Sequence, residues 1–185
     1  MKKIRISPLS AVFLPLAFLI CGAKQFALFL AAVIIHESGH VAFILLSSQK
    51  IVSVSILPCG LDIKREGSSS YLTDAAIYIA GPLFNIVFAL FSYIFLPSLA
   101  FANLAFGVFN LLPVIPLDGG CTLRALMLNY STLDFAYKVT RIISASFLFI
   151  TYIGAIIILM YSSWNASLLF LCIMLFFLTF FESGM

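Results

Sequence analysis

The sequence predicts an all-α polytopic membrane protein of about six transmembrane helices. A small β-hairpin or sheet at the membrane surface is expected between the second and third spans. Two observations carry this prediction. Hydrophobic residues make up 63% of the 185 residues and charged residues 9%, with a mean hydropathy of +1.18, which is far outside the range of soluble domains. Apolar runs approaching the roughly 20 residues needed to cross a bilayer also recur along the chain.

Six apolar segments are the expected spans, at residues 9–23, 26–46, 72–96, 97–112, 139–161 and 166–181. Only Lys24 and Gln25 separate the first two segments, which predicts a tight helical hairpin. A basic start before a short apolar run is also typical of a signal peptide, so cleavage of the first segment stays an alternative. Gly81-Pro82 is expected to interrupt and kink the third segment, because proline removes a backbone donor.

The polar stretch at residues 47–70 is predicted to form the hairpin. Val52, Val54 and Ile56 alternate with serines, which is the period-2 pattern of a half-buried strand. A Pro-Cys-Gly turn then precedes a second extended piece at residues 61–65. An exposed strand edge can hold an extended substrate segment through backbone hydrogen bonds. A simple cover of the membrane surface is the alternative role.

The basic residues predict the orientation of the chain. With six spans, one side of the membrane receives nine of them and the other receives only Lys24; the nine are Lys2, Lys3, Arg5, Lys50, Lys64, Arg65, Arg124, Lys138 and Arg141. Because cytoplasmic loops are enriched in Lys and Arg, both termini are predicted to be cytoplasmic. The net charge of +3 is too small to suggest a nucleic-acid partner. The apolar composition makes the lipid bilayer the expected environment.

The only two histidines of the chain lie in the motif His36-Glu37-Ser38-Gly39-His40, inside the second apolar segment. Residues four apart share one helix face, so the two imidazoles can bind the same metal ion. Glu37 stands where zinc proteases keep the general base that activates a metal-bound water. Ionisable groups in lipid cost about 2.5–3.5 kcal/mol each and mark function. The motif therefore predicts one Zn²⁺ per chain.

Asp118 is the candidate for a third zinc ligand, because a catalytic zinc usually has three protein ligands. It alone among the remaining acidic residues follows a helix-breaking run inside an apolar stretch, and Gly119-Gly120 lets the backbone turn there. An N-cap for a short helix at residues 122–129 is the alternative role of Asp118. A glutamate as third ligand is disfavoured, because no well-placed glutamate follows the second segment.

Three motifs together resemble the site-2 protease family of intramembrane zinc metalloproteases (peptidase M50), with the small sporulation-type branch as the best match. They are H-E-S-G-H, A-G-P-L-F-N at residues 80–85 and F-N-L-L-P-V-I-P-L-D-G-G at residues 109–120. The resemblance covers roughly residues 26–125. It implies zinc bound by His36, His40 and Asp118, with Glu37 as catalytic base. It also implies regulated proteolysis of membrane-associated or transmembrane substrates, in a bacterial cell membrane.

The resemblance also assigns roles to two asparagines. It places Asn110 near the substrate or the charge at the scissile carbonyl, as a catalytic residue, and Asn85 matches the asparagine of the G-P-x-x-N segment. An amide donor aimed at an oxyanion contributes about 3–4 kcal/mol. Interhelical hydrogen bonding, worth about 0.6–2 kcal/mol, is the alternative for both residues. Asn103 belongs to no motif and is expected to serve packing.

Residues 1–185 are expected to form a single transmembrane metalloprotease domain with its catalytic core at about 26–125. A PDZ-like domain and the C-terminal nucleotide-sensing domain of some family members are not expected, so substrate delivery would depend on the membrane core or on separate regulatory membrane proteins. Two other functions stay open. A metal-ion or proton transporter could use the same His, Glu and Asp cluster, although the repeated halves common in transporters are not seen. An inactive membrane scaffold is the second.

Overall fold

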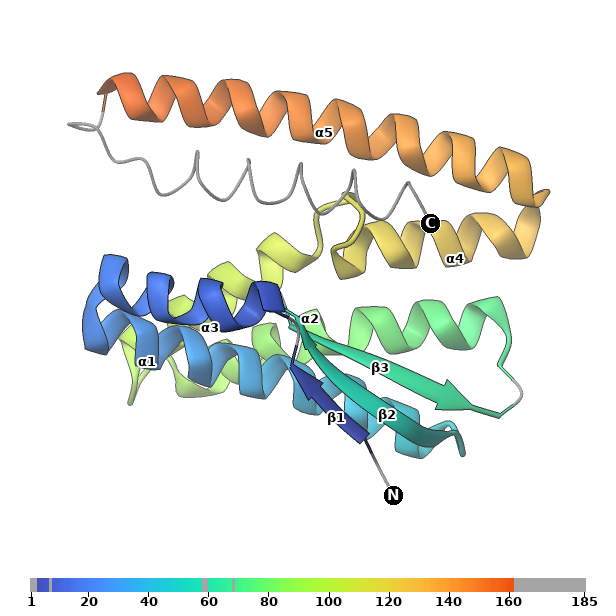
Figure 1. Cartoon of the computed structure of the whole chain (residues 1–185), viewed down its shortest axis with the longest axis horizontal. Coiled ribbons are helices and arrows are strands. Elements are labelled where there is room, and N and C mark those ends of the chain that lie inside the picture. The colour runs from blue at the N-terminus through green and yellow to red at the C-terminus, as the bar shows by residue number, and fades with distance from the viewer. Residues whose placement is uncertain (1–2, 7, 58–59, 68, 162–185) are drawn as a thin grey trace. The chain divides into compact units, whose positions relative to one another are not determined.

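The computed structural model describes residues 3–6, 8–57, 60–67 and 69–161, which belong to two compact units, Met1–Asn110 and Leu111–Met185. The described part is mostly helical, as predicted. The first unit contains β1 (Lys3–Ile6), α1 (Pro8–Leu46), β2 (Lys50–Leu57), β3 (Gly60–Glu66), α2 (Tyr71–Ser92) and α3 (Pro97–Asn110). The second unit contains α4 (Asp118–Tyr130) and α5 (Leu133–Tyr161) (Figure 1).

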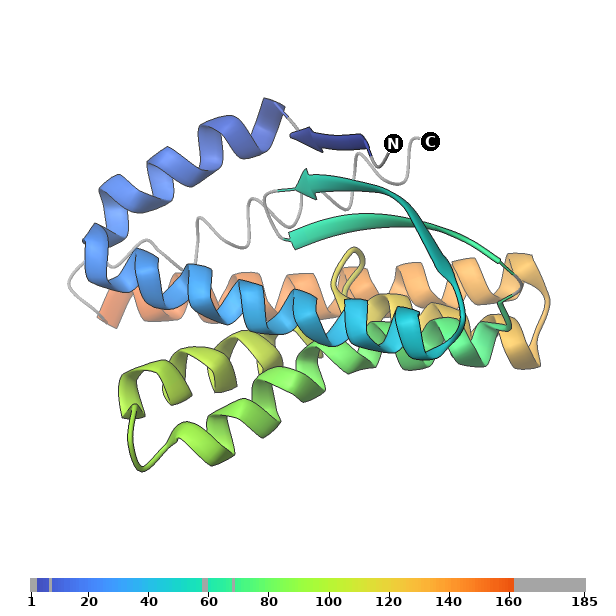
Figure 2. The same ribbon diagram turned by 90° about the horizontal axis from the view of Figure 1, so that it is seen from below.

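The predicted helical hairpin near the N-terminus is confirmed, but its turn lies at Gly22. This glycine interrupts α1 with φ 78° and ψ 163°, a conformation that a residue with a side chain rarely adopts. Lys24 and Gln25, the expected turn, are already helical. Figure 2 shows the two arms of α1 folding back from this point. Phe18 and Phe26 pack edge to face near the turn, with ring centroids 5.4 Å apart.

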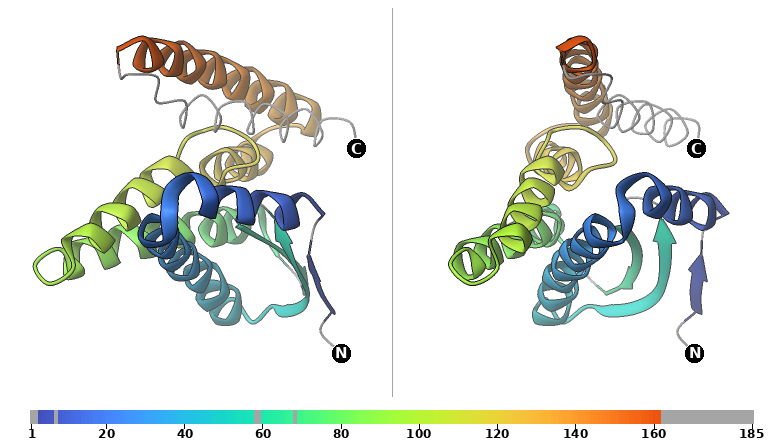
Figure 3. Two further views of the ribbon diagram at one scale, coloured as in Figure 1. Left: turned by 60° about the vertical axis from the view of Figure 1, so that its left-hand side comes forward. Right: turned by 90° about the vertical axis from the view of Figure 1, so that its left-hand side faces the viewer.

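The predicted β-hairpin is confirmed as the antiparallel pair of β2 and β3, which runs from Lys50 opposite Glu66 to Leu57 opposite Gly60. The sequence analysis missed a third strand. β1 pairs with β2 in parallel, with Lys3 opposite Ser53, so β2 is the central strand. Its four residues are too few to show a clear strand period, and their basic side chains suggested only a charged N-terminus. The strands fold back beside the C-terminal arm of α1 (Figure 3).

Helix α2 crosses Gly81 and Pro82 without a break, so the predicted interruption is wrong. It continues through Gly81 and Pro82 to Ser92, and it begins at the cap residue Ser70, whose hydroxyl accepts from the Thr73 amide at 3.1 Å. Pro82 is fully buried. Both α1 and α3 pack on α2, and we attribute the continuity of the helix to this packing, which outweighs the intrinsic cost of an internal proline.

The described residues bear out part of the expected number of spans. Three helices there are long and apolar enough to cross a membrane, at Gly22–Leu46, Tyr71–Ser92 and Leu133–Ile157. Helix α3 has 14 residues, or about 21 Å, which is shorter than a hydrocarbon core of about 30 Å. It ends at Asn110, before the proline-containing run that cannot continue a helix. The expected span at 166–181 lies outside the described residues.

The second unit places α4 against α5 after a short turn. The guanidinium of Arg124 in α4 lies 5.0 Å from the ring centroid of Tyr137 in α5, a cation–π contact between the two helices. Both helices start earlier than the sequence predicted: α4 at Asp118 and α5 at Leu133. The added first turn of α4 contains Asp118 itself, so this boundary decides how the carboxylate is presented.

Candidate metal centre

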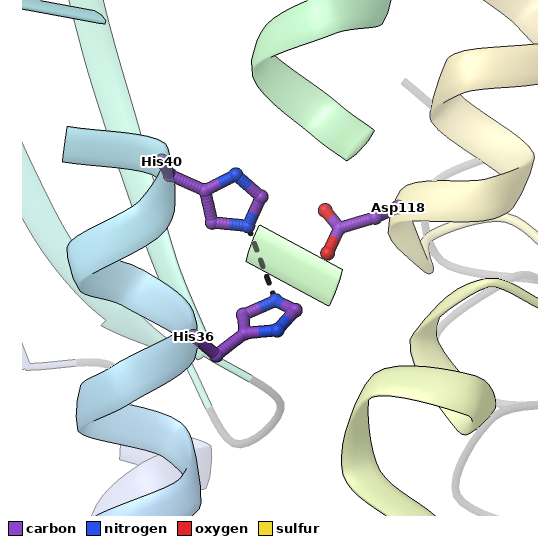
Figure 4. A group of neighbouring side chains, drawn as sticks. All are labelled: His36, His40 and Asp118. Atoms are coloured by element: carbon purple, nitrogen blue, oxygen red, sulfur yellow. Dashed lines mark hydrogen bonds between the residues drawn. The ribbon is translucent and has the colours of Figure 1, made fainter. Parts of the chain in front are cut away.

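His36 and His40 lie on one face of the C-terminal arm of α1, as their spacing predicted. Their side chains are 3% and 8% exposed, and their ring centroids are 4.7 Å apart with the rings at 81°. The two Nε2 atoms approach to 3.1 Å. Figure 4 draws both rings, together with the carboxyl group of Asp118. A buried pair of converging imidazole nitrogens is therefore built from a single helix.

The hydrogen bonds to helix α2 determine which nitrogen each ring presents. His40 Nδ1 lies 2.8 Å from the carbonyl oxygen of Ile77, which can only accept, so Nδ1 must donate. His36 Nδ1 lies 2.6 Å from Oδ1 of Asn85, whose Nδ2 in turn donates to the Ala32 carbonyl at 2.9 Å. In its neutral form each ring would therefore carry its hydrogen on Nδ1, with the lone pair on Nε2.

With both hydrogens on Nδ1, the two Nε2 lone pairs would face each other across the short Nε2–Nε2 distance. Two nitrogens that both lack a hydrogen cannot bond to each other, and their lone pairs repel unless a cation or proton joins them. Two nitrogens bound to one tetrahedral zinc at 2.0–2.1 Å would lie about 3.3 Å apart, close to the 3.1 Å observed. His36, His40 and Asp118 offer one ligand atom each, and this N, N, O donor set fits zinc.

Gly81 in α2 leaves the space in which the two nitrogens meet. A Cβ added there would lie 2.6 Å from Cε1 of His40 and 2.9 Å from Nε2 of His36. Gly39 shows the same close approach from the other helix, since its Cβ would lie 2.7 Å from the Ala80 carbonyl. Because contacts this short do not occur at real Cβ atoms, glycine at both positions allows α1 and α2 to pack closely at the centre.

The predicted base, Glu37, follows the first histidine in α1 and is 8% exposed. Its place directly after the first histidine is the one in which an H-E-x-x-H motif keeps the general base. On the His36 side, the ring of Phe106 from α3 packs edge to face, with centroids 5.0 Å apart. This aromatic contact limits the motion of the His36 ring and shields it from solvent or lipid.

The three asparagines of the sequence analysis have different surroundings. Asn85 contacts the ring of His36, so it belongs to the metal centre. Asn110 is the last residue of α3, is 5% exposed and donates to the Phe106 carbonyl at 2.9 Å. The expectation that Asn103 only packs is wrong, because its Oδ1 accepts from Nδ2 of Asn85 at 2.7 Å. An asparagine within an apolar segment is the sequence signal that could have predicted this hydrogen bond, and the side chain is fully buried.

Asp118 lies in the second unit, as the first residue of α4. The N-cap of this helix is Leu117, so the alternative role of Asp118 as the cap is wrong. Its carboxylate instead occupies the first turn, where the positive end of the helix dipole favours a negative charge. Two backbone hydrogen bonds close the preceding loop, from Val114 to Leu112 and from Leu117 to Val114, at 2.8 and 2.7 Å.

Helix α5 holds this loop through Ser144, which is 1% exposed. Its hydroxyl accepts from the Ile115 amide at 3.1 Å and donates to the Pro113 carbonyl at 3.3 Å. Gly119 and Gly120 pack directly on the same loop: a Cβ at Gly119 would meet the Leu111 carbonyl, and one at Gly120 would lie 2.6 Å from the Val114 carbonyl. The geometry of Asp118 is thus set by one serine and two glycines.

The histidine pair and the fold define a class of protein. An H-E-x-x-H motif on a buried face of an apolar, membrane-length helix, with Nδ1 of both rings held by hydrogen bonds, is typical of membrane-embedded zinc metalloproteases. A hydrogen-bonded histidine pair that shares one proton is the alternative explanation of the 3.1 Å distance between the two Nε2 atoms.

Comparisons with known proteins find similar proteins within this class. Residues 95–154 match peptidase family M50. The chain is 32% identical over 131 residues to stage IV sporulation protein FB of Bacillus subtilis, covering 64% of this chain and 45% of that protein. It is 32% identical over 123 residues to a zinc metalloprotease of Methanocaldococcus jannaschii, covering 57% and 34%. The matches thus span less than half the length of these two relatives.

A solved structure extends the likeness over nearly the whole chain. The site-2 protease from Methanocaldococcus jannaschii matches with a TM-score of 0.68 and 26% identity, covering 97% of this chain and 90% of that one. The chain is thus similar in sequence to members of peptidase family M50 and in fold to a site-2 protease.

Proposed function

We propose that this chain is an intramembrane zinc endopeptidase that cleaves membrane-associated or transmembrane proteins, with His36, His40 and Asp118 as the ligands of one zinc ion. The observation that carries the proposal is the pair of Nε2 atoms 3.1 Å apart, each presented by a ring whose Nδ1 is already bonded. The M50 match and the zinc metalloprotease relatives support the choice of metal and reaction. Donor chemistry and the position in the first turn of α4 support Asp118.

Each residue would have a defined task in hydrolysis. Zinc held at this centre would supply Lewis-acid activation of the scissile carbonyl and of the attacking water. The Glu37 carboxylate would take a proton from that water and pass it to the leaving amine nitrogen. An amide nitrogen carries two hydrogens, and the bond from Asn110 to the Phe106 carbonyl uses one of them. The other could be donated to the oxyanion that forms on the substrate.

We also propose that the chain crosses the membrane six times with both termini in the cytoplasm. The three long helices account for part of this count. Helix α3 would complete its crossing with the irregular run that follows it, because non-helical backbone is tolerated at membrane depth where protein surrounds it. The unequal distribution of basic residues supports the orientation.

The direct test is Glu37→Gln, measured as cleavage of tagged single-span membrane peptides in detergent or liposomes. We expect cleavage to fall by about 10²–10⁴-fold with zinc still bound, because the ligands are untouched. Glu66→Gln is the matched control, since Glu66 is an exposed residue at the end of β3. Full cleavage by Glu37→Gln would exclude this mechanism. Metal-dependent ion flux through liposomes without any peptidase activity would instead establish a transporter.

A further inference from the structure

We infer that Asn103 is a positioning residue of the metal centre, which acts through Asn85 to hold His36 in the tautomer that can bind a metal ion. The inference deepens the proposed function and rests on His36 being a ligand. It follows from a chain of hydrogen bonds that connects α3, α2 and α1. Asn85 and Asn103 are both 0% exposed, so water does not replace any of these bonds.

The chain starts at a backbone carbonyl that fixes the orientation of Asn103. Its Nδ2 donates to the Leu99 carbonyl at 2.9 Å, one turn earlier in α3. A carbonyl oxygen accepts only, so the amide nitrogen must face it. The Oδ1 of Asn103 is then directed at Asn85, where it accepts from Nδ2 at 2.7 Å. Asn103 thus presents a fixed acceptor to helix α2.

The second step fixes Asn85. Its Nδ2 donates to the Asn103 oxygen and, at 2.9 Å, to the Ala32 carbonyl of α1, which uses both of its hydrogens. Rotating this amide by 180° would set its oxygen against two other oxygens. The Oδ1 of Asn85 must therefore face Nδ1 of His36, at 2.6 Å.

The third step fixes the histidine. A neutral imidazole carries one hydrogen, and a neighbouring acceptor holds it on Nδ1, which leaves the lone pair on Nε2 for a metal ion. If the Asn85 amide rotated, its N–H would face Nδ1 of His36. This contact would favour the tautomer with the hydrogen on Nε2, and Nε2 could then not bind a metal ion. Asn103 supplies one of the two acceptors that prevent this rotation, and Ala32 supplies the other.

Two variants of Asn103 separate positioning from packing. Asn103→Leu keeps a similar volume and suits an apolar helix, but it removes the acceptor for Asn85. Asn103→Asp keeps an oxygen acceptor toward Asn85 whether its carboxyl group is neutral or ionised. A packing role predicts that leucine is tolerated at least as well as aspartic acid. The positioning role predicts the reverse order.

The measurement is the ¹⁵N NMR spectrum of histidine-labelled, metal-free protein in detergent micelles at about pH 9, where imidazole is neutral. The chain has only two histidines, so each spectrum reports His36 and uses His40 as an internal control. The Nδ1 of His40 donates to the Ile77 carbonyl, independently of Asn85. We expect both rings to carry hydrogen on Nδ1 in the wild type and in Asn103→Asp. In Asn103→Leu, only His36 should shift toward the Nε2–H form.

Zinc affinity, measured by competition with a chelator, gives a second readout. We expect about a tenfold loss for Asn103→Leu and less than a twofold loss for Asn103→Asp, since removing outer partners of a metal ligand typically costs 10–100-fold. If Asn103→Leu does not fold, Asn103→Ala replaces it, because alanine also lacks the acceptor. Unchanged His36 signals in the variant that lacks the acceptor, or an equal loss in Asn103→Asp, would overturn the inference.

The failure of this inference can be distinguished from the failure of the proposed function. The tautomer is read in metal-free protein without any substrate, so it does not depend on proteolysis. A wild type that binds zinc but cleaves nothing would contradict the protease proposal and leave the NMR result valid. If the protein is an active protease but the His36 tautomer is the same in Asn103→Leu as in the wild type, only the positioning role is contradicted.

Discussion

The two parts of the proposed zinc site are built on different physical principles. The histidine pair lies on one regular helix, where the helical repeat alone places residues four apart on the same face. Asp118 instead follows an irregular loop, whose shape depends on the hydroxyl of Ser144 and on two glycines that pack against it. The placement of the two histidine nitrogens therefore depends on the orientation of their side chains. The placement of the Asp118 carboxylate depends on the backbone geometry of its loop.

The difference also appears in the partners of each ligand. His36 and His40 are oriented by acceptors on neighbouring helices, Asn85 and the Ile77 carbonyl, so their helix could form without these acceptors. The Asp118 loop has no regular ladder to support it, and Ser144 joins its two sides. We therefore expect substitutions near the histidines to change metal binding more than stability. Substitutions near Asp118 should change both.

Gly81→Ala should have the largest effect. Its Cβ would lie 2.6 Å from Cε1 of His40, within the space where the ligand atoms meet. We expect zinc affinity to fall by about 100-fold or more, as for the loss of an essential partner of the ligands. Chelator competition on detergent-purified protein measures this.

The matched control for this variant is Gly154→Ala in α5, where an added Cβ meets no atom of the described residues within 4 Å. It should leave zinc affinity unchanged and raise stability by about 0.5–1 kcal/mol, because alanine restricts the unfolded chain and favours helix. Wild-type zinc affinity in Gly81→Ala would show that the two helices can separate without cost, contrary to the close packing described above.

Ser144→Ala should have an intermediate effect on both properties. The buried hydroxyl bonds to both sides of the loop before Asp118, so its loss should cost about 1–3 kcal/mol of stability. We expect zinc affinity to fall by about tenfold, since the carboxylate loses part of its support. Unfolding in denaturant and chelator competition measure the two effects.

Thr140→Val is the control for Ser144→Ala, because Thr140 is equally buried one turn earlier in α5. Within the described part of the chain, its hydroxyl donates to the Ala136 carbonyl of its own helix. Its loss should change stability by less than about 1 kcal/mol and leave zinc affinity as in the wild type. Equal losses of stability and of zinc affinity in both variants would mean that the loop contacts of Ser144 do not support the Asp118 carboxylate.

Arg65→Ala should have the smallest effect, because it lies in the sheet and not at either part of the site. The guanidinium bonds to Asp74 at 3.0 Å, and the two side chains are 18% and 28% exposed. Such a partly exposed pair is worth less than about 1 kcal/mol. Thermal unfolding should show a small shift with unchanged zinc affinity. A tenfold loss of zinc affinity would instead reveal that the hairpin is coupled to the metal centre.

The same contrast explains what the sequence could predict. The spacing of His36 and His40 is a local property of a helix, so the pair was found directly. The hairpin of β2 and β3 was also predictable, because only two residues separate the strands in the sequence. The contact between His36 and Asn85 joins residues 49 apart, and only the packing of α1 on α2 creates it. Asn103 was missed for the same reason.

The errors in the fold have equally specific causes. The turn at Gly22 was misplaced to the adjacent polar pair, because polarity is a weaker turn determinant than the freedom of glycine at positive φ. Pro82 was expected to interrupt α2, but helix packing maintains the helix around it. β1 was missed because its partner lies about fifty residues away in the chain, and a four-residue strand has no clear pattern of its own.

Zinc content is the most direct test of the claim that both parts serve one metal ion. Metal analysis would compare detergent-purified wild type with His36→Ala, Asp118→Ala and the control Asp134→Ala, which changes an exposed aspartate at the start of α5. We expect about one zinc per chain in the wild type and the control, and much less in the other two variants. Undiminished zinc in Asp118→Ala would contradict the shared site.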